Sequence, residues 1–387
     1  MPCFRGYVPE IARRSRLVYV TDLALRPSGG GAYAVNWHAA DFLAKRFDVT
    51  YAGPIVPRSG FVEQAASKVR RRILRHPGLF TYFSPTTLDR NARRAESHFT
   101  DDMDAVMFRS STRWCRCRPP VPYFVYLDAV FHTFFYNTFS PRDFVFSDLS
   151  RIWEEEAEFL EGAAGVFFEG QFGLDEAREA YELKGDHYLA PGRGGVIDPP
   201  AGDSWDGQSQ RLVTIAMNWR QKGGDIVLDA YRQLKQRFPA LTWNIVGGPP
   251  DGDWRQPGVT YEGVLRTDRP AERLRLVDLL SNAFLLVHPT REDVSPLVLT
   301  EAAYFGCPAV SVNFAGIPEL VINNKTGILV SPPASVESVA AAVAELLEDR
   351  ERYLAMRREA RVDSLANHSW ERSGDVICDE IERRLGR

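Results

Sequence analysis

The stretch "HPTREDVSPLVLTEAAYFGCPAVSVNFAGIPEL", residues 288–320, decides the fold and the site that we expect. The apolar run 284–287 just before it predicts a buried strand. A charged loop follows this strand. A helix is predicted over 296–305, because Ser295 is a good N-cap and Gly306 is a good C-terminal stop. The pattern is therefore that of a strand, a loop and a helix.

Three acids surround the start of this helix: Glu292, Asp293 and Glu301. A helix N-terminus suits a phosphate, whereas an ionised carboxylate accepts hydrogen bonds from sugar hydroxyls. Together they describe a site for a nucleotide sugar. Glu292 is better explained as a solvated side chain or as a complement to the helix dipole, but Glu301 lies within a mainly apolar helix and indicates a function. The other ligand-binding residues predicted at the helix start are Ser295, Leu297 and Val298.

Strands alternate with helices along the rest of the chain. In the first half we expect a glycine loop at 28–31, an acidic helix at 148–163, and strands at 16–22, 48–53, 104–108, 122–129 and 164–170. After a linker rich in Gly, Pro and Asp, at 192–210, the pattern restarts with strands at 211–217, 241–248 and 258–263 and a helix at 271–283. This alternation predicts two doubly wound parallel sheets, with ligands bound at the carboxyl ends of their strands.

The composition is that of an ordinary globular chain. Of the 387 residues, 44% are hydrophobic and 25% are charged, and no apolar run is long enough to span a bilayer. The first 20 residues lack the apolar segment of a secretory signal. The five cysteines are too scattered for a disulfide framework. We therefore expect a cytoplasmic protein.

Charge is distributed unevenly. The first 120 residues contain 20 basic and 10 acidic side chains, although the whole chain has a net charge of −4. The densest basic segment is "SKVRRRILRHP" (67–77). This segment is either a solvated helix face or a surface that attracts anionic lipid headgroups or an anionic acceptor. In the second case the protein would be peripheral at the inner face of the membrane. We expect no nucleic-acid partner, because no recognisable nucleic-acid module accompanies it.

The opening stretch resembles the signature of retaining glycosyltransferases of family 4, which have the GT-B fold. Asp293 and Glu301 have the spacing of the two acids of that signature, and "AGIPELV" (315–321) is similar to its last part. The first acid is commonly Glu in the family, so Asp293 is a departure that shortens its reach. The resemblance implies that Glu301 binds the ribose and that Asp293 contacts the transferred sugar.

A second segment, "NWRQKGGDIVLDAY" (218–231), resembles the family's diphosphate-binding turn. Lys222 matches the lysine of that turn. The usual arginine lies five or six residues earlier, where this chain has Ala216 or Met217, and Arg220 is a possible substitute. The resemblance assigns Lys222 and Arg220 to donor binding, and Lys222 also to catalysis.

The first half contains similar matches. "PSGGGAYAV" (27–35) is similar to the family's glycine loop, which implies that Gly30 and Gly31 lie near the donor phosphate. Asp128 ends a predicted strand, and His132 follows four residues later. The resemblance makes both candidates for catalysis, although a lone histidine is often structural.

The resemblance implies a domain at 1–197 on the acceptor side, completed by a C-terminal helix at 368–387 that crosses back to it, and a nucleotide-sugar domain at 198–367. The implied activity is retaining, metal-independent transfer of a hexosyl unit from a UDP- or GDP-linked sugar to a glycan, lipid-linked or small-molecule acceptor, as in glycan biosynthesis. No cofactor is implied. Two Asp-x-Asp pairs, 102–104 and 251–253, are attributed to chance rather than to a metal.

Three alternatives remain open. The segment 29–34 also fits a dinucleotide fingerprint, which would indicate an NAD(P)-dependent oxidoreductase, although the second strand lacks the acid that holds a ribose. A nucleotide-sugar epimerase would share the GT-B fold without the Asp293–Glu301 pair. A non-catalytic binding protein is the third alternative.

Overall fold

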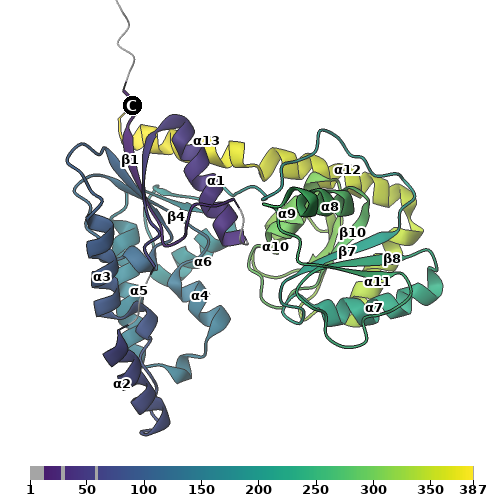
Figure 1. The fold of residues 1–387 in the computed structure, drawn as a ribbon, viewed down its shortest axis with the longest axis horizontal. Helices are drawn as coiled ribbons and strands as arrows, with labels where there is room; N and C mark the ends of the chain where they lie inside the picture. The colour runs from purple at the N-terminus through teal and green to yellow at the C-terminus, as the bar shows by residue number, and fades with distance from the viewer. Residues whose placement is uncertain (1–12, 28–30, 57–59, 387) are drawn as a thin grey trace, which may run out of the picture.

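The computed structural model describes residues 13–27, 31–56 and 60–386. Gly30 and most of the predicted glycine loop thus lie outside the described residues. Within the described ranges, the strands form two parallel six-stranded sheets, each packed against helices and lying side by side (Figure 1). This is the pair of doubly wound α/β domains expected from the sequence.

The first sheet has the strand order β2-β1-β3-β4-β5-β6. Its strands are β1 (Arg16–Val20), β2 (Asp48–Ala52), β3 (Ala105–Arg109), β4 (Tyr123–Leu127), β5 (Gly165–Phe168) and β6 (Tyr188–Leu189). The strands β4 and β5 are apolar runs without alternation, and so is β3 up to its last residue, Arg109, as expected when both faces of a parallel sheet are buried.

Helices cover both faces of this sheet. Along β1, Leu17 and Tyr19 pack in the core beside α1, whereas Val18 and Val20 pack in the core on the opposite face. The helices of this part are α1 (Gly31–Arg46), α2 (Phe61–Arg72), α3 (Pro85–Glu96), α4 (Phe131–Thr138), α5 (Phe146–Glu161) and α6 (Gln171–Tyr181), with short 3-10 turns at Thr81–Phe83, Thr112–Trp114 and Pro141–Asp143.

The second sheet has the order β12-β11-β10-β7-β8-β9. Its strands are β7 (Arg211–Ala216), β8 (Thr242–Gly247), β9 (Val259–Gly263), β10 (Ala283–His288), β11 (Ala309–Val312) and β12 (Gly327–Val330). Its helices are α7 (Gly224–Arg237), α8 (Pro270–Ser281), α9 (Leu297–Tyr304), α10 (Ile317–Leu320) and α11 (Val336–Glu348). The strand β10 is central and fully buried, so its carboxyl end brings the loop after it to the middle of the sheet edge.

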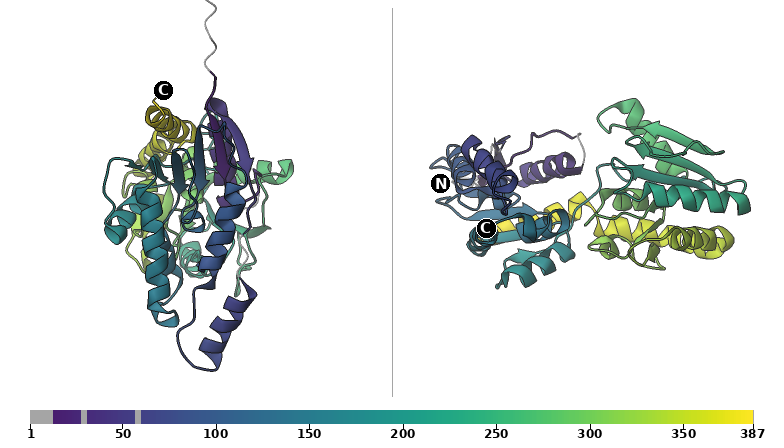
Figure 2. Two further views of the ribbon diagram at one scale, coloured as in Figure 1. Left: turned by 90° about the vertical axis from the view of Figure 1, so that its left-hand side faces the viewer. Right: turned by 90° about the horizontal axis from the view of Figure 1, so that it is seen from below.

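Two long helices connect the domains, as Figures 1 and 2 show in yellow. Helix α12 (Arg350–Asn367) packs against α9, and α13 (Trp370–Arg384) packs against α1. Gly374 allows the close approach of α13, because a Cβ there would lie 2.8 Å from the Cβ of Phe42. The predicted return of the C-terminal helix to the first domain is therefore confirmed. The exact domain boundaries stay predictions.

Candidate functional site

A cleft of about 660 Å³ opens between the two domains, where the carboxyl ends of both sheets meet. The loops after β1, β4 and β5 bring Asp22, Asp128 and Glu169 to it. The loop after β10 brings Asp293 to it from the second domain. Since open α/β sheets bind ligands at the carboxyl ends of their strands, this cleft is the candidate site.

Asp293 is held from two sides. Lys222 forms an ion pair with one carboxylate oxygen, and Nε2 of His288 lies 2.8 Å from the other. Burial alone would raise the pKa of Asp293, but the hydrogen bond with His288 and the charge of Lys222 outweigh it and hold this pKa well below its usual range. Asp293 is therefore ionised and fixed in the cleft at neutral pH.

The turn that carries Lys222 requires glycine. Gly223 has a φ of 73°, and a Cβ there would lie 2.2 Å from the carbonyl oxygen of Pro289. This close approach places the turn directly against the loop after β10. Lys222 and Asp293, two residues predicted from separate motifs, are thereby brought together.

Arg220 occupies a different position from the one expected for a phosphate ligand. Its side chain is 80% exposed, and its Nε lies 3.6 Å from a carboxylate oxygen of Asp251. The carbonyl of Arg220 accepts a hydrogen bond from Arg291, which fixes the backbone but leaves the guanidinium in solvent. The structure thus places Lys222, but not Arg220, beside Asp293.

The start of α9 differs from the expectation in one detail. Pro296 has extended backbone angles (φ −75°, ψ 124°) and occupies the N-cap, so the helix begins at Leu297 and the prediction that Ser295 caps it is wrong. Ser295 instead receives a hydrogen bond from Arg193, with 3.2 Å between Nη2 and Oγ. The predicted C-terminal stop at Gly306 is confirmed by its φ of 70°.

The other predicted residues around α9 lie on two sides of the helix. Leu297 lines the cleft and touches the first domain, where a Cβ on Gly31 would lie 2.8 Å from its Cδ1. Val298 packs instead against the core of the second domain. Gly31 and Leu297 therefore mark the place where the N-termini of α1 and α9 approach each other.

Glu301 is buried beneath the segment that joins the domains. Its Oε1 accepts a hydrogen bond from the backbone N–H of Val196 at 2.8 Å. Burial raises the pKa of Glu301, despite this hydrogen bond and the charge of Arg193. Burial therefore disfavours the charged form of Glu301, and its environment differs from that of a solvated surface acid.

The two candidates from β4 and α4 are separated by the structure. Asp128 follows β4 directly, is exposed and lines the cleft. The ring of His132 instead packs with Tyr136, Trp153 and Tyr181. Burial lowers the pKa of His132. This placement favours a packing role for His132 over a catalytic one.

Sequence reasoning missed a buried charged cluster at the floor of the cleft. Glu169 forms ion pairs with Arg109 and, at 2.8 Å, with Arg193. All three side chains are at least nine-tenths buried and line the cleft. Glu169 and Arg109 each lie at the end of a predicted strand, which is a signal that could have identified them. Arg193 lies in the segment that was interpreted as a linker.

A second contact between the domains involves the "GIPEL" segment. Glu319 accepts hydrogen bonds from the backbone N–H groups of Gln171, at 2.8 Å, and Phe172. These are the first amides of α6, so a carboxylate of the second domain caps a helix of the first. This contact holds one side of the cleft closed.

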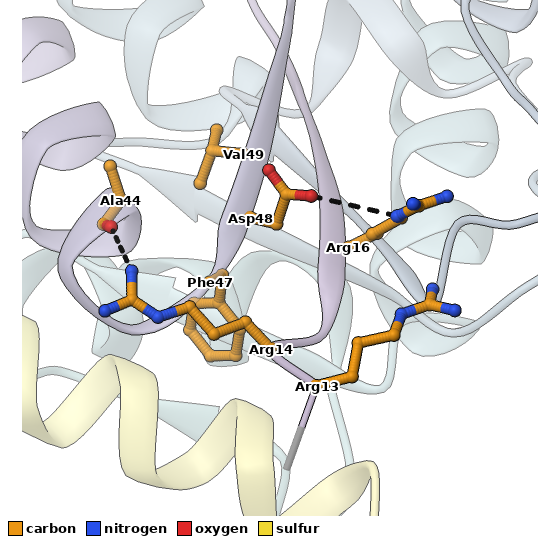
Figure 3. A pocket seen from close by; sticks show the side chains of 7 residues that line it. All are labelled: Arg13, Arg14, Arg16, Ala44, Phe47, Asp48 and Val49. Atoms are coloured by element: carbon orange, nitrogen blue, oxygen red, sulfur yellow. Dashed lines mark hydrogen bonds and ion pairs between the residues drawn. The ribbon is translucent and has the colours of Figure 1, made fainter. Parts of the chain in front are cut away.

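A smaller hollow lies at the opposite edge of the first sheet, around the start of β1 (Figure 3). It is lined by Arg13, Arg14, Arg16, Ala44, Phe47, Asp48 and Val49. Arg16 is paired with Asp102 of the first Asp-x-Asp match, as well as with Asp48.

In the described ranges, no three His, Cys, Asp or Glu side chains are grouped as metal ligands would be.

Comparison with known proteins finds a family match in the second domain. Residues 205–363 match the family model of the glycosyl transferases group 1. The chain is 32% identical over 183 residues to the GDP-mannose-dependent alpha-(1-6)-phosphatidylinositol monomannoside mannosyltransferase of Mycolicibacterium smegmatis. This alignment covers 45% of this chain and 48% of that protein. The chain is also 32% identical over 154 residues to the glycogen synthase of Mycobacterium tuberculosis (39% and 37% of the two chains). The chain thus spans about half the length, or less, of these curated relatives.

Solved structures match nearly the whole chain. Sucrose-phosphate synthase from Thermosynechococcus elongatus aligns with a TM-score of 0.68 at 17% identity, over 96% of this chain and 99% of that one. WaaG, a glycosyltransferase involved in lipopolysaccharide biosynthesis, aligns with a TM-score of 0.59 at 14% identity, over 94% and 99%. These matches confirm the GT-B fold. The oxidoreductase and epimerase alternatives are not favoured by the family match of residues 205–363 and by the glycosyltransferase relatives.

Proposed function

From the glycosyl transferases group 1 family, to which residues 205–363 belong, and the GT-B fold of the chain, we propose that this protein is a retaining, metal-independent hexosyltransferase. The donor would be a nucleotide-diphosphate sugar, and the acceptor a glycan, a lipid-linked sugar or a small molecule. The observation that carries the proposal is the ion pair of Lys222 with Asp293, which lies in the loop before α9 and lines the cleft between the domains.

The geometry supports a division of roles. The diphosphate would lie at the N-terminus of α9 beside Lys222, where the helix dipole and the ammonium group favour negative charge. Glu301 would accept a hydrogen bond from the ribose, since Val196 occupies only its Oε1. Asp293 would contact the transferred sugar, and Asp128 faces the same cleft from the acceptor side.

Retention would follow from attack on the same face from which the diphosphate leaves. In this step the bond between the anomeric carbon and the phosphate oxygen breaks, and a bond from the acceptor hydroxyl oxygen forms. The hydroxyl proton passes to the departing phosphate. Lys222 would stabilise the charge that develops on this leaving group. Closure of the cleft would exclude water, which otherwise hydrolyses the donor.

Donor turnover tests the proposal. We expect release of the nucleoside diphosphate from one class of UDP- or GDP-hexose, faster when a suitable acceptor is present and unchanged by EDTA. Nuclear magnetic resonance of the product should show the anomeric configuration of the donor. An inverted product or complete loss of activity in EDTA would contradict the mechanism, and an absence of donor turnover with every acceptor class would contradict the function.

The pKa of Glu301 leads to a prediction about stability. Because burial raises this pKa above its value in the unfolded chain, the wild-type protein loses stability as the pH rises from the ordinary glutamate range through the folded-state pKa. Glu301→Gln keeps an acceptor for Val196 without the buried charge. The variant should therefore unfold at a higher urea concentration than wild type at pH 7, and this difference should disappear near pH 4. Equal midpoints at pH 7 would contradict the prediction.

The basic segment 67–77 contains two exposed apolar side chains. Ile73 is 73% exposed and Leu74 is 53% exposed, and both follow the basic end of α2. Helix α2 lies at the outer end of the first domain in Figure 1. Exposed apolar side chains among basic ones are typical of a surface that docks on an anionic membrane. No helix of the described chain is long and apolar enough to cross a membrane.

We therefore propose that this end of α2 docks the first domain on an anionic lipid surface. Each basic residue close to such a surface contributes about 1 kcal/mol, and the attraction weakens as salt shortens the Debye length from about 10 Å at 0.1 M to about 3 Å at 1 M. In vesicle flotation, the protein should float with anionic lipid at low salt and much less at high salt.

A matched pair of variants sharpens this test. Ile73→Ser should reduce flotation, whereas Leu274→Ser, which alters a side chain that is 69% exposed on the second domain, should not. Equal flotation with neutral and anionic vesicles, or none with either, would identify the basic segment as a solvated helix face.

A further inference from the structure

The proposed donor site lacks one positive charge that the family resemblance leads us to expect. Ala216 and Met217 occupy the positions of the usual arginine, and Arg220 is directed into solvent. Lys222, the remaining cation of that turn, is paired with Asp293. A diphosphate at the start of α9 would therefore need a further cation from elsewhere.

Three arginines line the cleft among the described residues: Arg109, Arg113 and Arg193. Arg113 is engaged with Asp22, at 2.8 Å. Both terminal nitrogens of Arg109 are used, one by the carbonyl of Tyr126 at 2.9 Å and one by Glu169. The Nε atoms of Arg109 and Arg113 are also buried without a hydrogen-bond partner. Arg193 differs from both because it contacts Ser295 in the loop before α9, so it is the candidate for the further cation.

Arg193 is directed toward the start of α9. Its Nη2 donates to the carbonyl oxygen of Ser295 and lies 3.2 Å from Oγ of the same residue. Its Nε lies 2.8 Å from Glu169. Arg193 is only 7% exposed. Its Nη1 is buried and has no hydrogen-bond partner within the described chain. A buried donor without a partner is costly, and a ligand oxygen would satisfy it.

We propose that Arg193 binds the diphosphate of the donor, in place of the arginine that the turn before α7 lacks. This inference rests on the proposed function. Arg193 contacts the loop before α9 at Ser295, and Lys222 contacts the same loop at Asp293, two residues earlier. Both cations thus contact the loop that leads into α9, at whose N-terminus the phosphates would lie. Because Nη2 is used by Ser295 and Nε by Glu169, the phosphate contact would be made by Nη1 of Arg193.

The charge around Arg193 agrees with this role. Arg109 and Arg193 share the single carboxylate of Glu169, so this buried cluster carries one more positive than negative group. Asp128 is also near, but its carboxylate is exposed and screened by solvent. Glu169 and Ser295 hold the guanidinium in place before the ligand arrives, as a preorganised site requires.

Titration calorimetry of Arg193→Gln tests the inference, with whichever of UDP and GDP binds the wild-type protein and with the matching nucleoside. We expect the affinity for the diphosphate to fall about tenfold or more, because a charged contact to phosphate is lost. The affinity for the nucleoside should change less than about threefold. The matched control is Arg237→Gln, which alters a side chain that is 61% exposed at the end of α7 and lies outside the cleft lining. It should leave both affinities within about twofold of wild type.

The outcomes separate the inference from the function on which it rests. A wild-type protein that binds neither diphosphate contradicts the proposed function. A wild-type protein that binds one, together with a folded Arg193→Gln variant of unchanged affinity, overturns only the role of Arg193. Equal losses for nucleoside and diphosphate also overturn it, since a structural defect would affect both. If Arg193→Gln does not fold, Arg193→Lys should show a smaller selective loss for the diphosphate, and failure of both variants to fold would assign Arg193 to packing.

Discussion

Replacement of Lys222 by alanine is expected to lower kcat by about 100-fold or more, which is the effect of removing one preorganised charge from a developing anion. The ammonium group is already fixed by its ion pair with Asp293, so little reorganisation is needed when the donor binds. The rate should be measured as release of nucleoside diphosphate at saturating donor. Binding of the nucleoside without phosphates should be the same in the variant and in wild type.

The matched control for this prediction is Lys325→Ala. Lys325 lies on the second domain, outside the cleft lining, in a half-exposed pair with Glu359 at 3.4 Å. Its loss should leave kcat within about twofold, as for most surface pairs. Because Lys222→Ala also removes a partner of Asp293, the fold of the variant should be checked by thermal unfolding. Normal turnover by folded Lys222→Ala would show that the diphosphate lies elsewhere.

Glu301→Ala is expected to weaken nucleotide binding by about 1–3 kcal/mol, or about five- to 150-fold, because a charged hydrogen bond to the ribose is lost. The side chain is 6% exposed, so water cannot easily replace it. Calorimetric titration with the nucleoside diphosphate gives the affinity directly. The matched control is Glu337→Ala, which removes an exposed acid from the first turn of α11 and should not change the affinity.

A 2′,3′-dideoxy nucleotide separates a ribose contact from a general defect. It lacks the hydroxyls that Glu301 would bind, so wild type and Glu301→Ala should bind it equally. If the variant instead loses affinity for both nucleotides in the same proportion, Glu301 acts by supporting the segment around Val196. Unchanged affinity for the natural nucleotide in folded Glu301→Ala would refute its assignment to the ribose.

The sequence was sufficient to predict the long buried strands. Because β4, β7 and β10 are covered on both faces, they appear as unbroken apolar runs, and their predicted ends lie within two residues of the observed ones. The strands β11 and β12 were not predicted. Each has four residues, which is too short for periodicity to distinguish a strand from other buried segments.

The site could be predicted where local motifs carry it. Lys222 and Asp293 are 71 residues apart, but each lies in a turn with its own pattern, and the structure brings the two side chains together. Arg193 could not be found in this way, because its segment has no periodicity. The position of this segment depends on partners elsewhere in the chain. Glu169 pairs with Arg193, and the indole nitrogen of Trp370 donates to the carbonyl of Gly195 at 2.6 Å.

His132 is a candidate from the sequence that the structure places away from the site. The resemblance made both His132 and Asp128 candidates for one site, but Asp128 lies in the loop after β4, whereas His132 is on α4 and its direction is set by that helix. On α4 the ring of His132 lies 4.6 Å from that of Tyr136, on the side that meets Trp153 of α5. A preference for aromatic neighbours cannot be recognised from the histidine alone, because it depends on how α4 and α5 pack.

We expect the cleft to bind a nucleotide-diphosphate sugar through the second domain, and a comparative titration of four nucleotides would show whether it does. UDP, GDP, ADP and NADP⁺ should each be titrated into the wild-type protein by calorimetry. The account predicts that one of the nucleoside diphosphates binds at one site per chain, that its hexose conjugate competes with it, and that NADP⁺ does not. Binding of NADP⁺ in the absence of any binding by the diphosphates would contradict the account.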